Sequence, residues 1–156
     1  IFCGNGGSAA DAQHLVAELL VRLRAKVNRR SLPAISLALD PSTLTACGND
    51  LGFDHIFSRP LESLGKKNDL LIAISTSGNS KNIINVLKLS RKMGIKTVGF
   101  LGAGGGGSKK YCDINLIVPS NKTARIQECH TFLGHHILES VENKLFNKKR
   151  TKLNDM

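Results

Sequence analysis

The chain has 156 residues, of which 41% are hydrophobic and 22% are charged. This composition is typical of one globular domain and excludes a disordered chain, and no apolar run approaches the ~20 residues that a membrane-spanning helix needs. The formal net charge of +10 favours anionic partners, but the positive residues are scattered and only 4% of the residues are aromatic, so we expect an anionic metabolite rather than a nucleic acid.

The first residues, Ile1 to Cys3, are apolar and lead directly into a glycine cluster, as at the end of a strand. The sequence begins without a methionine, so we expect an element ahead of this strand to be missing. At the other end, Lys148, Lys149 and Arg150 lie in a polar stretch. This pattern predicts a basic polar tail over residues 148–156, after a domain that covers residues 1–147.

Apolar, β-prone runs alternate with runs of helical periodicity along the chain. The predicted strands cover residues 1–3, 34–39, 69–74, 96–101 and 114–118. The predicted helices cover residues 8–24, 53–64, 80–93 and 123–147, and a polar, turn-rich stretch surrounds residues 48–50. Such alternation predicts a single-domain α/β fold: a parallel five-stranded sheet flanked by helices, arranged as a three-layer sandwich of the flavodoxin or Rossmann type.

The cysteines are spaced too far apart for a zinc ribbon or a dense disulfide framework. They stand at positions 3, 47, 112 and 129 and form no CxxC pair. We therefore expect reduced thiols and a cytoplasmic location.

Three loops follow predicted strands, at the sheet edge where α/β folds bind ligands. The first, GNGGSA from Gly4 to Ala9, is a loose match to the dinucleotide fingerprint. A dinucleotide site also needs an acid about 20 residues further on, and Asp40 lies too far along the chain. A tight turn with positive φ is a second interpretation. We favour a third, in which the glycine backbone and Ser8 approach an anionic or polyol ligand.

The second loop, residues 75–80, has the sequence STSGNS and holds four hydroxyl groups. Hydroxyl donors and the free N–H groups of a helix N-terminus together suit a phosphate group. The alternative is a helix N-cap with spare serines, but a cap needs only one hydroxyl. We favour phosphate binding. The third loop, residues 102–108, holds five glycines, and we expect a mobile surface loop without an assigned role.

His14 and Glu18 lie one turn apart on one face of the first predicted helix, and Arg22 continues that face. The pair is suited to hold a metal or to join a base to a partner that orients it. An exposed ladder of ion pairs is the alternative, and the spacing alone does not decide between them.

The last predicted helix carries Gln127, His130 and His135. An apolar stripe over positions 126, 129, 133, 137 and 141 runs near His130, which we therefore expect in the core. His135 points to nearly the opposite side, against another surface of the protein or another subunit. Gln127 and His135 are about 12 Å apart along the helix axis, so sharing one metal requires both to lean together or to come from different chains.

Four sequence segments together resemble the phosphoheptose isomerases, a group within the sugar isomerase (SIS) domain family of phosphosugar-binding proteins. The segments are GNGGSAADAQH, CGNDLGFDHIFSR, ISTSGNS, and ARIQECH followed by His135. They span almost the whole chain and occur in the family's order. The family has a helix ahead of the first strand that this sequence lacks, in agreement with the missing element expected above.

The resemblance implies an aldose–ketose isomerase that converts sedoheptulose 7-phosphate to D-glycero-D-manno-heptose 7-phosphate through an enediol, for bacterial heptose and lipopolysaccharide synthesis. It implies Glu18 and His135 as the acid/base pair. It implies a zinc ion, one per subunit, held by His14, Glu18, Gln127 and His135. The implied sugar contacts are Asn5, Gly6, Gly7, Ser8, Asn49, Asp50 and Gln127, and the implied phosphate contacts are Ser75, Thr76, Ser77 and Ser80. It also implies a homotetramer with active sites at subunit contacts, without a membrane.

Two other functions remain open for a protein of this family. One sister group binds a replication initiator protein and shares several of the segments above, but it lacks the acid at the position of Glu18 and the histidine at the position of His135. Similar domains also act as phosphosugar sensors in transcription regulators. Because this chain keeps both Glu18 and His135, we expect the enzyme.

Overall fold

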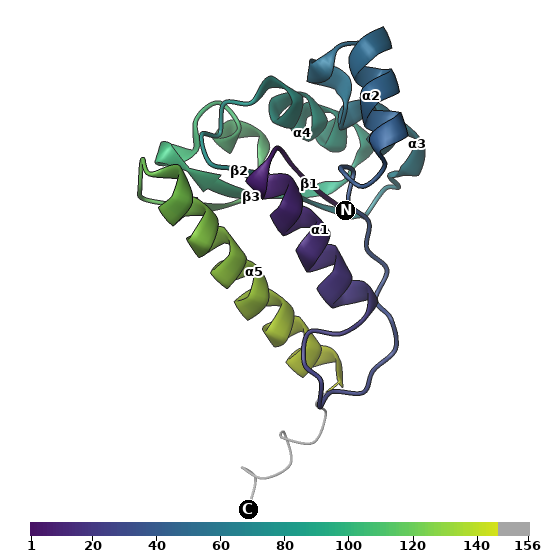
Figure 1. Ribbon diagram of the computed structural model, residues 1–156, viewed down its shortest axis with the longest axis vertical. Helices are drawn as coiled ribbons and strands as arrows, with labels where there is room; N and C mark the ends of the chain where they lie inside the picture. Colours follow the sequence, from purple (N-terminus) through teal and green to yellow (C-terminus); the bar gives the residue numbers. More distant parts are fainter. Residues whose placement is uncertain (147–156) are drawn as a thin grey trace, which may run out of the picture.

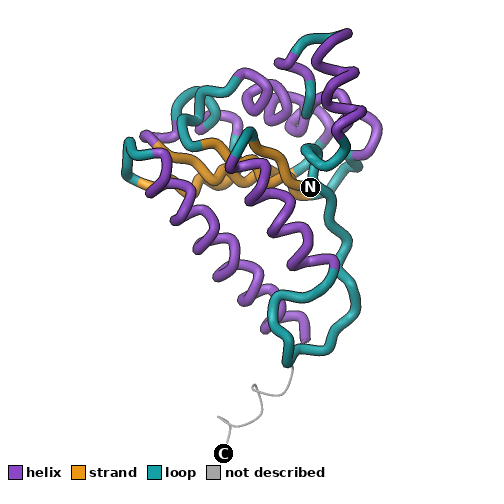
Figure 2. The backbone as a smooth tube through the Cα atoms, in the orientation of Figure 1, coloured by secondary structure: helices purple, strands orange, loops and turns teal. Residues whose placement is uncertain are grey.

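A parallel sheet of four strands forms the centre of the protein. The computed structural model describes residues 1–146. The strands are β1 (Phe2–Gly4), β2 (Leu70–Ser75), β3 (Lys96–Gly102) and β4 (Ile114–Val118), and they lie in chain order in one layer (Figure 2). In the register, Ala73 of β2 pairs with Cys3 on one side and Gly99 on the other. All four carboxyl ends therefore meet at one edge of the sheet.

Helices cover both faces of the sheet (Figure 1). One face carries α1 (Gly7–Leu20) and α5 (Thr123–Phe146), and the other carries α2 (Pro41–Asp50), α3 (Ser58–Leu64) and α4 (Lys81–Met93). Three short 3₁₀ turns are η1 (Phe53–His55), η2 (Ala103–Gly105) and η3 (Lys109–Tyr111). The predicted α/β domain with a parallel sheet between helices is confirmed. No helix among the described residues is both long and apolar enough to cross a bilayer.

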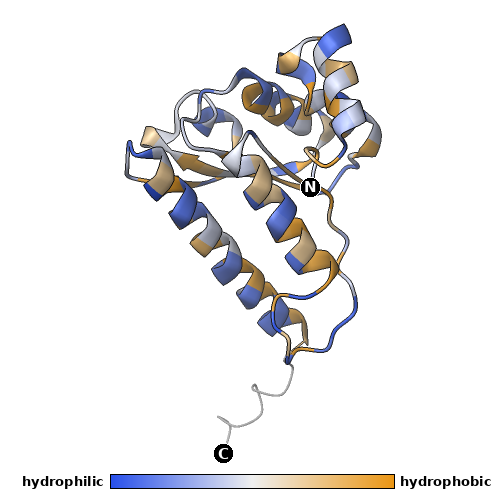
Figure 3. Ribbon diagram, viewed as in Figure 1, coloured by the Kyte–Doolittle hydropathy of each residue, from blue (hydrophilic) through white to orange (hydrophobic). Residues whose placement is uncertain are grey.

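The side chains of β2 alternate between two hydrophobic cores, because successive residues of a strand point to opposite faces. Leu71 and Ala73 pack with Leu87 on the side of α4. Ile72 and Ile74 pack with Leu15 and other residues on the side of α1 and α5. Figure 3 shows hydrophobic residues in the strands and on α4. Burial on both faces explains why the strands have continuous apolar sequences.

The predicted fifth strand, residues 34–39, is wrong: this segment forms one isolated bridge, between Phe2 and Ser36. Two backbone hydrogen bonds hold it, from Phe2 N to Ile35 O and from Leu37 N to Phe2 O, both at 2.9 Å. β1 is only three residues long and Gly4 leads straight into the turn before α1. The segment is apolar because Leu37 and its neighbours are buried, but it has almost no strand to pair with.

Residues after Asp40 form a helix where a polar, turn-rich stretch was expected. Asp40 is the N-cap of α2, its side chain accepts a hydrogen bond from Ser42 N at 3.0 Å, and Pro41 occupies the first helical position. These are common helix-start signals, and they outweigh the turn-forming residues at the end of α2. The helix expected over residues 53–64 is divided into η1 and α3, and the one expected over residues 8–24 ends at Leu20.

The predicted basic tail, residues 148–156, lies outside the described residues. The boundary of the domain at residue 147 therefore stays a prediction.

Candidate active site

α1 and α5 lie side by side on one face of the sheet (Figure 1), and they bring together residues that are 120 positions apart in sequence. Thr131 Oγ1 donates a hydrogen bond to Asp11 Oδ1 at 2.7 Å. Further along, Gly134 lies against Leu15, and a Cβ at Gly134 would be 2.6 Å from a Leu15 methyl group. The absence of a side chain at Gly134 lets the two helices approach closely.

This approach brings together His14, Glu18 and His135. The two Nε2 atoms of His14 and His135 are 2.7 Å apart, with the rings edge to face, and Glu18 Oε1 is 3.7 Å from His14 Nε2. His14 is exposed and the other two are half-buried, so the cluster is open to solvent. His135 thus faces α1 of its own chain. Arg22 does not extend the cluster, because its guanidinium donates to the Ala25 carbonyl group.

The cluster fits a zinc ion in the kind and number of its donor atoms. One ligand atom from each of the three residues lies within 4.8 Å of the others. Two imidazoles and a carboxylate are ordinary zinc ligands, and three protein ligands leave a position open, as catalytic zinc sites require. The imidazole pair would have to exchange its mutual hydrogen bond for metal contacts, because one Nε2 must carry a proton in that bond.

Gln127 is not part of this cluster. Its amide packs against Gly7 at the start of α1, where a Cβ at position 7 would overlap Gln127 Nε2. Since eight positions separate them, Gln127 lies about two turns along α5 from His135. That place is beside the first glycine loop.

The first loop combines backbone freedom with a fixed side chain. Gly6 has φ +55° and nothing within 4 Å of a Cβ built on it, so its backbone is open to a ligand. Asn5 exchanges two hydrogen bonds with Asn82 of α4, each at 2.9 Å. Ser8 is buried in the first turn of α1. The loop is thus tied to the start of α4, which is where the serine-rich loop ends.

The serine-rich loop contains hydroxyl groups at different depths: Ser77 is exposed, Thr76 and Ser80 are half-buried, and Ser75 is buried. Ser75 Oγ accepts a hydrogen bond from Gly78 N, and Ser77 Oγ accepts one from Asn79 N, both at 3.1 Å. Each hydroxyl that accepts in this way still has its own proton to donate. Ser80 occupies the N-cap of α4 but makes no capping hydrogen bond, and Thr76 is half-buried. The hydroxyl groups exceed what the helix start uses.

The glycine-rich segment, residues 102–108, packs against the serine-rich loop, in contrast to the mobile surface loop that we expected. Gly107 N donates to Asn79 Oδ1 and Ser108 N donates to Gly78 O, both at 2.8 Å. A Cβ at Gly106 would lie 2.6 Å from the Ser77 carbonyl oxygen. Only glycines allow this approach of two backbones. The signal in the sequence was the position of the five glycines directly after a strand, at the same sheet edge as the serines.

Asn49 and Asp50 lie on a different helix from the other candidates. They end α2, on the opposite face of the sheet from His14 and Glu18 (Figure 1). Both side chains are exposed, and Asn49 Nδ2 donates to Asp50 Oδ1 at 2.8 Å.

Comparison with known proteins identifies the family. Residues 1–102 match the SIS domain. The phosphoheptose isomerase of Aliarcobacter butzleri is 56% identical over 145 residues, which are 93% of this chain and 76% of that protein. The chain belongs to the phosphoheptose isomerases.

Two solved phosphoheptose isomerases share the fold, both with a TM-score of 0.84. The protein of Neisseria gonorrhoeae is 42% identical, and the match covers 91% of this chain and 74% of that one. The protein of Francisella tularensis is 38% identical, with 92% of this chain and 75% of that one covered. Membership of the phosphoheptose isomerases confirms the expected family and enzyme class, a sugar-phosphate isomerase.

Proposed function

We propose that this phosphoheptose isomerase converts sedoheptulose 7-phosphate to D-glycero-D-manno-heptose 7-phosphate, for bacterial heptose and lipopolysaccharide synthesis. The observation that carries the proposal is the cluster of His14, Glu18 and His135 on two adjacent helices. We place the reaction in the cytoplasm, since all four cysteines are free.

The reaction moves a carbonyl group from C2 of the ketose to C1 of the aldose. The Glu18 carboxylate would remove a proton from C1 and return it to C2, by way of an enediol. His135 would move the hydroxyl proton between the oxygens on C2 and C1. Since the cluster is open to solvent on one side, the end of an extended sugar has access to both groups.

The phosphate group would be held at the carboxyl end of β2, away from the reacting carbons. Anchoring it there restricts C1 and C2 to one place in the cluster. The proposed phosphate contacts are Ser75, Thr76, Ser77 and Ser80. The proposed sugar contacts are Asn5, Gly6, Gly7, Ser8, Asn49, Asp50 and Gln127. Asn49 and Asp50, on the opposite face of the sheet from the cluster (Figure 1), would contact the sugar in a site formed between subunits.

Replacing Ser77 and Ser80 together with Ala is expected to raise the KM for sedoheptulose 7-phosphate roughly 10- to 100-fold, because hydrogen bonds to a charged group are lost. The kcat should change less, since neither hydroxyl lies at the reacting carbons. Steady-state kinetics provide the measurement, with Ser63→Ala, an exposed serine on α3, as the control. An unchanged KM in the double variant would count against the phosphate site.

We also propose one zinc ion per subunit, held by His14, Glu18 and His135. When bound, zinc acts as a Lewis acid that stabilises negative charge on a substrate oxygen. Gln127, proposed as a further ligand, would require a change of position or a second copy of the chain. We also propose a homotetramer with sites at subunit contacts, which would cover apolar side chains that one chain leaves exposed, among them Val21 and Phe132.

Thorough chelation is expected to remove about one zinc per subunit and most of the activity, and added zinc should restore both. His14→Ala should bind less zinc than the wild type, whereas His55→Ala, at an exposed histidine in η1, should bind as much. Elemental analysis and an isomerase assay measure the two effects. Full activity after complete removal of the metal would show that the reaction proceeds by acid/base chemistry without zinc.

The assay on sedoheptulose 7-phosphate also separates the two other functions. A protein that bound the phosphosugar without converting it would be a sensor. A protein that neither bound nor converted it would be closer to the group that binds the replication initiator.

A further inference from the structure

The end of α1 that carries Glu18 is held by a buried arginine from the following loop. The Arg29 side chain has no exposed surface. Its Nη2 donates to the Glu18 carbonyl oxygen at 2.6 Å, and its Nη1 donates to the Leu19 carbonyl oxygen at 2.9 Å. Arg29 therefore satisfies two of the carbonyl groups that the last turn of a helix leaves without a partner.

Backbone groups of the following loop also hold this end of α1: Leu32 N donates to the Leu19 carbonyl oxygen at 3.1 Å, and Leu23 N donates to Glu142 Oε1 at 3.3 Å. The helix itself has few features that would fix its C-terminus. Its last turn contains no basic residue, and the residue at the C-cap, Val21, does not adopt the left-handed conformation that commonly ends a helix. The positive charge of Arg29 also lies at the negative end of the helix dipole. Arg29 thus contributes two hydrogen bonds and a favourable charge to this helix end.

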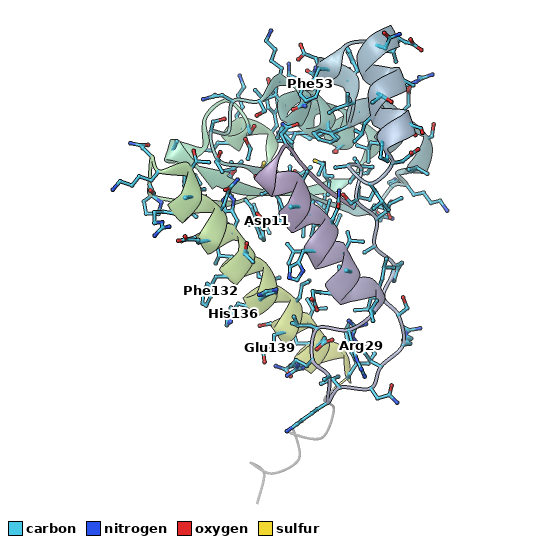
Figure 4. All side chains as sticks on the ribbon, in the orientation of Figure 1. Asp11, Arg29, Phe53, Phe132, His136 and Glu139 are labelled. Atoms are coloured by element: carbon cyan, nitrogen blue, oxygen red, sulfur yellow. The ribbon has the colours of Figure 1, made fainter. Side chains whose placement is uncertain are left out.

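The same guanidinium group binds α5. Arg29 Nε donates to Glu142 Oε1 at 2.6 Å, and the Glu142 side chain is 1% exposed. Burial alone would raise the pKa of Glu142, but hydrogen bonds from Arg29 and Arg24 outweigh it and hold the pKa below its ordinary value. Glu142 is therefore ionised at neutral pH. Figure 4 shows Arg29 beside the end of α5.

Glu142 lies seven residues after His135, about two turns further along the same side of α5. One planar group thus joins the backbone of Glu18 to the helix that carries His135. On the other side of the cluster, Asp11 and Thr131 join the same two helices. The cluster lies between these two links.

We propose that Arg29, paired with Glu142, is a positioning residue: it fixes the end of α1 against α5 and so sets the place of the Glu18 carboxylate relative to His135. This inference rests on the proposed function, in which Glu18 transfers the proton between C1 and C2. Proton transfer needs a base within hydrogen-bond reach of the carbon, and a displacement of about 1 Å can cost about 100-fold in rate.

The test is Arg29→Lys, which keeps the charge beside Glu142 but loses the two-pronged contact with the carbonyl groups. We expect kcat to fall about 10- to 100-fold with KM within about twofold, because the phosphate loop is unaffected. Amide hydrogen exchange in the last turn of α1 should become faster. Arg59→Lys is the matched control, since Arg59 forms an exposed ion pair with Glu62 on α3.

A second variant separates positioning from stability. Arg29→Met combined with Glu142→Leu replaces the fully buried pair with apolar side chains, a change that often leaves stability intact. Arg24, which also bonds Glu142, keeps its hydrogen bonds to Glu139 and Asn143. The double variant also removes the contacts with α1, so kcat should fall as in Arg29→Lys, when both are assayed well below their unfolding temperatures.

The possible outcomes are distinct. If the wild type converts sedoheptulose 7-phosphate and both folded variants keep its kcat within about twofold, Arg29 only stabilises the fold and the inference is overturned. If the wild type itself does not convert the substrate, the proposed function fails, and the inference fails with it.

Discussion

Replacing Glu18 with Gln is expected to lower the kcat for sedoheptulose 7-phosphate by about 10²- to 10⁴-fold. Glutamine has nearly the same shape but cannot accept a proton from carbon at neutral pH. The side chain is half-buried, and its neighbour in the cluster, His14, is exposed, so the fold should survive the change. A coupled assay for the aldose product gives kcat, and thermal unfolding checks the fold.

Glu128→Gln is the matched control for this experiment. Glu128 is an exposed glutamate on α5 whose carboxylate pairs with Arg125. The same chemical change there should leave kcat unaltered. A wild-type rate in Glu18→Gln would falsify the role of Glu18 as the base, whatever the behaviour of the control.

His135→Ala should also reduce kcat by about 10²- to 10⁴-fold, because the group that moves the hydroxyl proton is lost. The variant loses the contact between His135 and His14, which links α1 to α5 near the middle of both helices. The Asp11–Thr131 and Arg29–Glu142 links remain, so the helices should stay together.

The adjacent histidine offers a close comparison. His136 is exposed, stacks with Phe132 and lies on the side of α5 away from α1 (Figure 4). His136→Ala should therefore keep the wild-type kcat. If His135→Ala kept the same wild-type kcat as His136→Ala, His135 would have no part in proton transfer.

The sheet and most helices could be predicted from sequence because burial on both faces produces continuous apolar strands. Residues 34–39 misled for the same reason: they are apolar and largely buried, but apolarity does not show which strand, if any, offers hydrogen bonds. For α2, the Asp40-Pro41 start was visible in the sequence. The turn-forming residues near the end of α2 favoured the prediction of a turn-rich stretch instead of a helix.

The candidate site was predictable in part. The spacing of His14 and Glu18 placed both on one face of a helix, whereas only the family resemblance joined them to His135, because no local spacing relates residues 121 positions apart. The buried positions of α5 include 126, 130, 134, 138 and 142. Apart from position 126, the predicted stripe lies one position before each of these, and its member Cys129 is exposed. The discrepancy arises because a glycine and a glutamate occupy buried positions. Glu142 is buried through its pairing with Arg29, 113 residues earlier, which no local pattern reveals.

The link between α1 and α5 has a consequence for how activity develops during synthesis. The His14–His135 contact spans 121 residues, and contacts between such distant residues form only after the loop between them has closed. A nascent chain can complete the sheet through β4 before any of α5 has left the ribosome, and that chain would have His14 and Glu18 without their partner. Isomerase activity would therefore appear only when α5 packs against α1, and a chain with a native-like sheet could still be inactive.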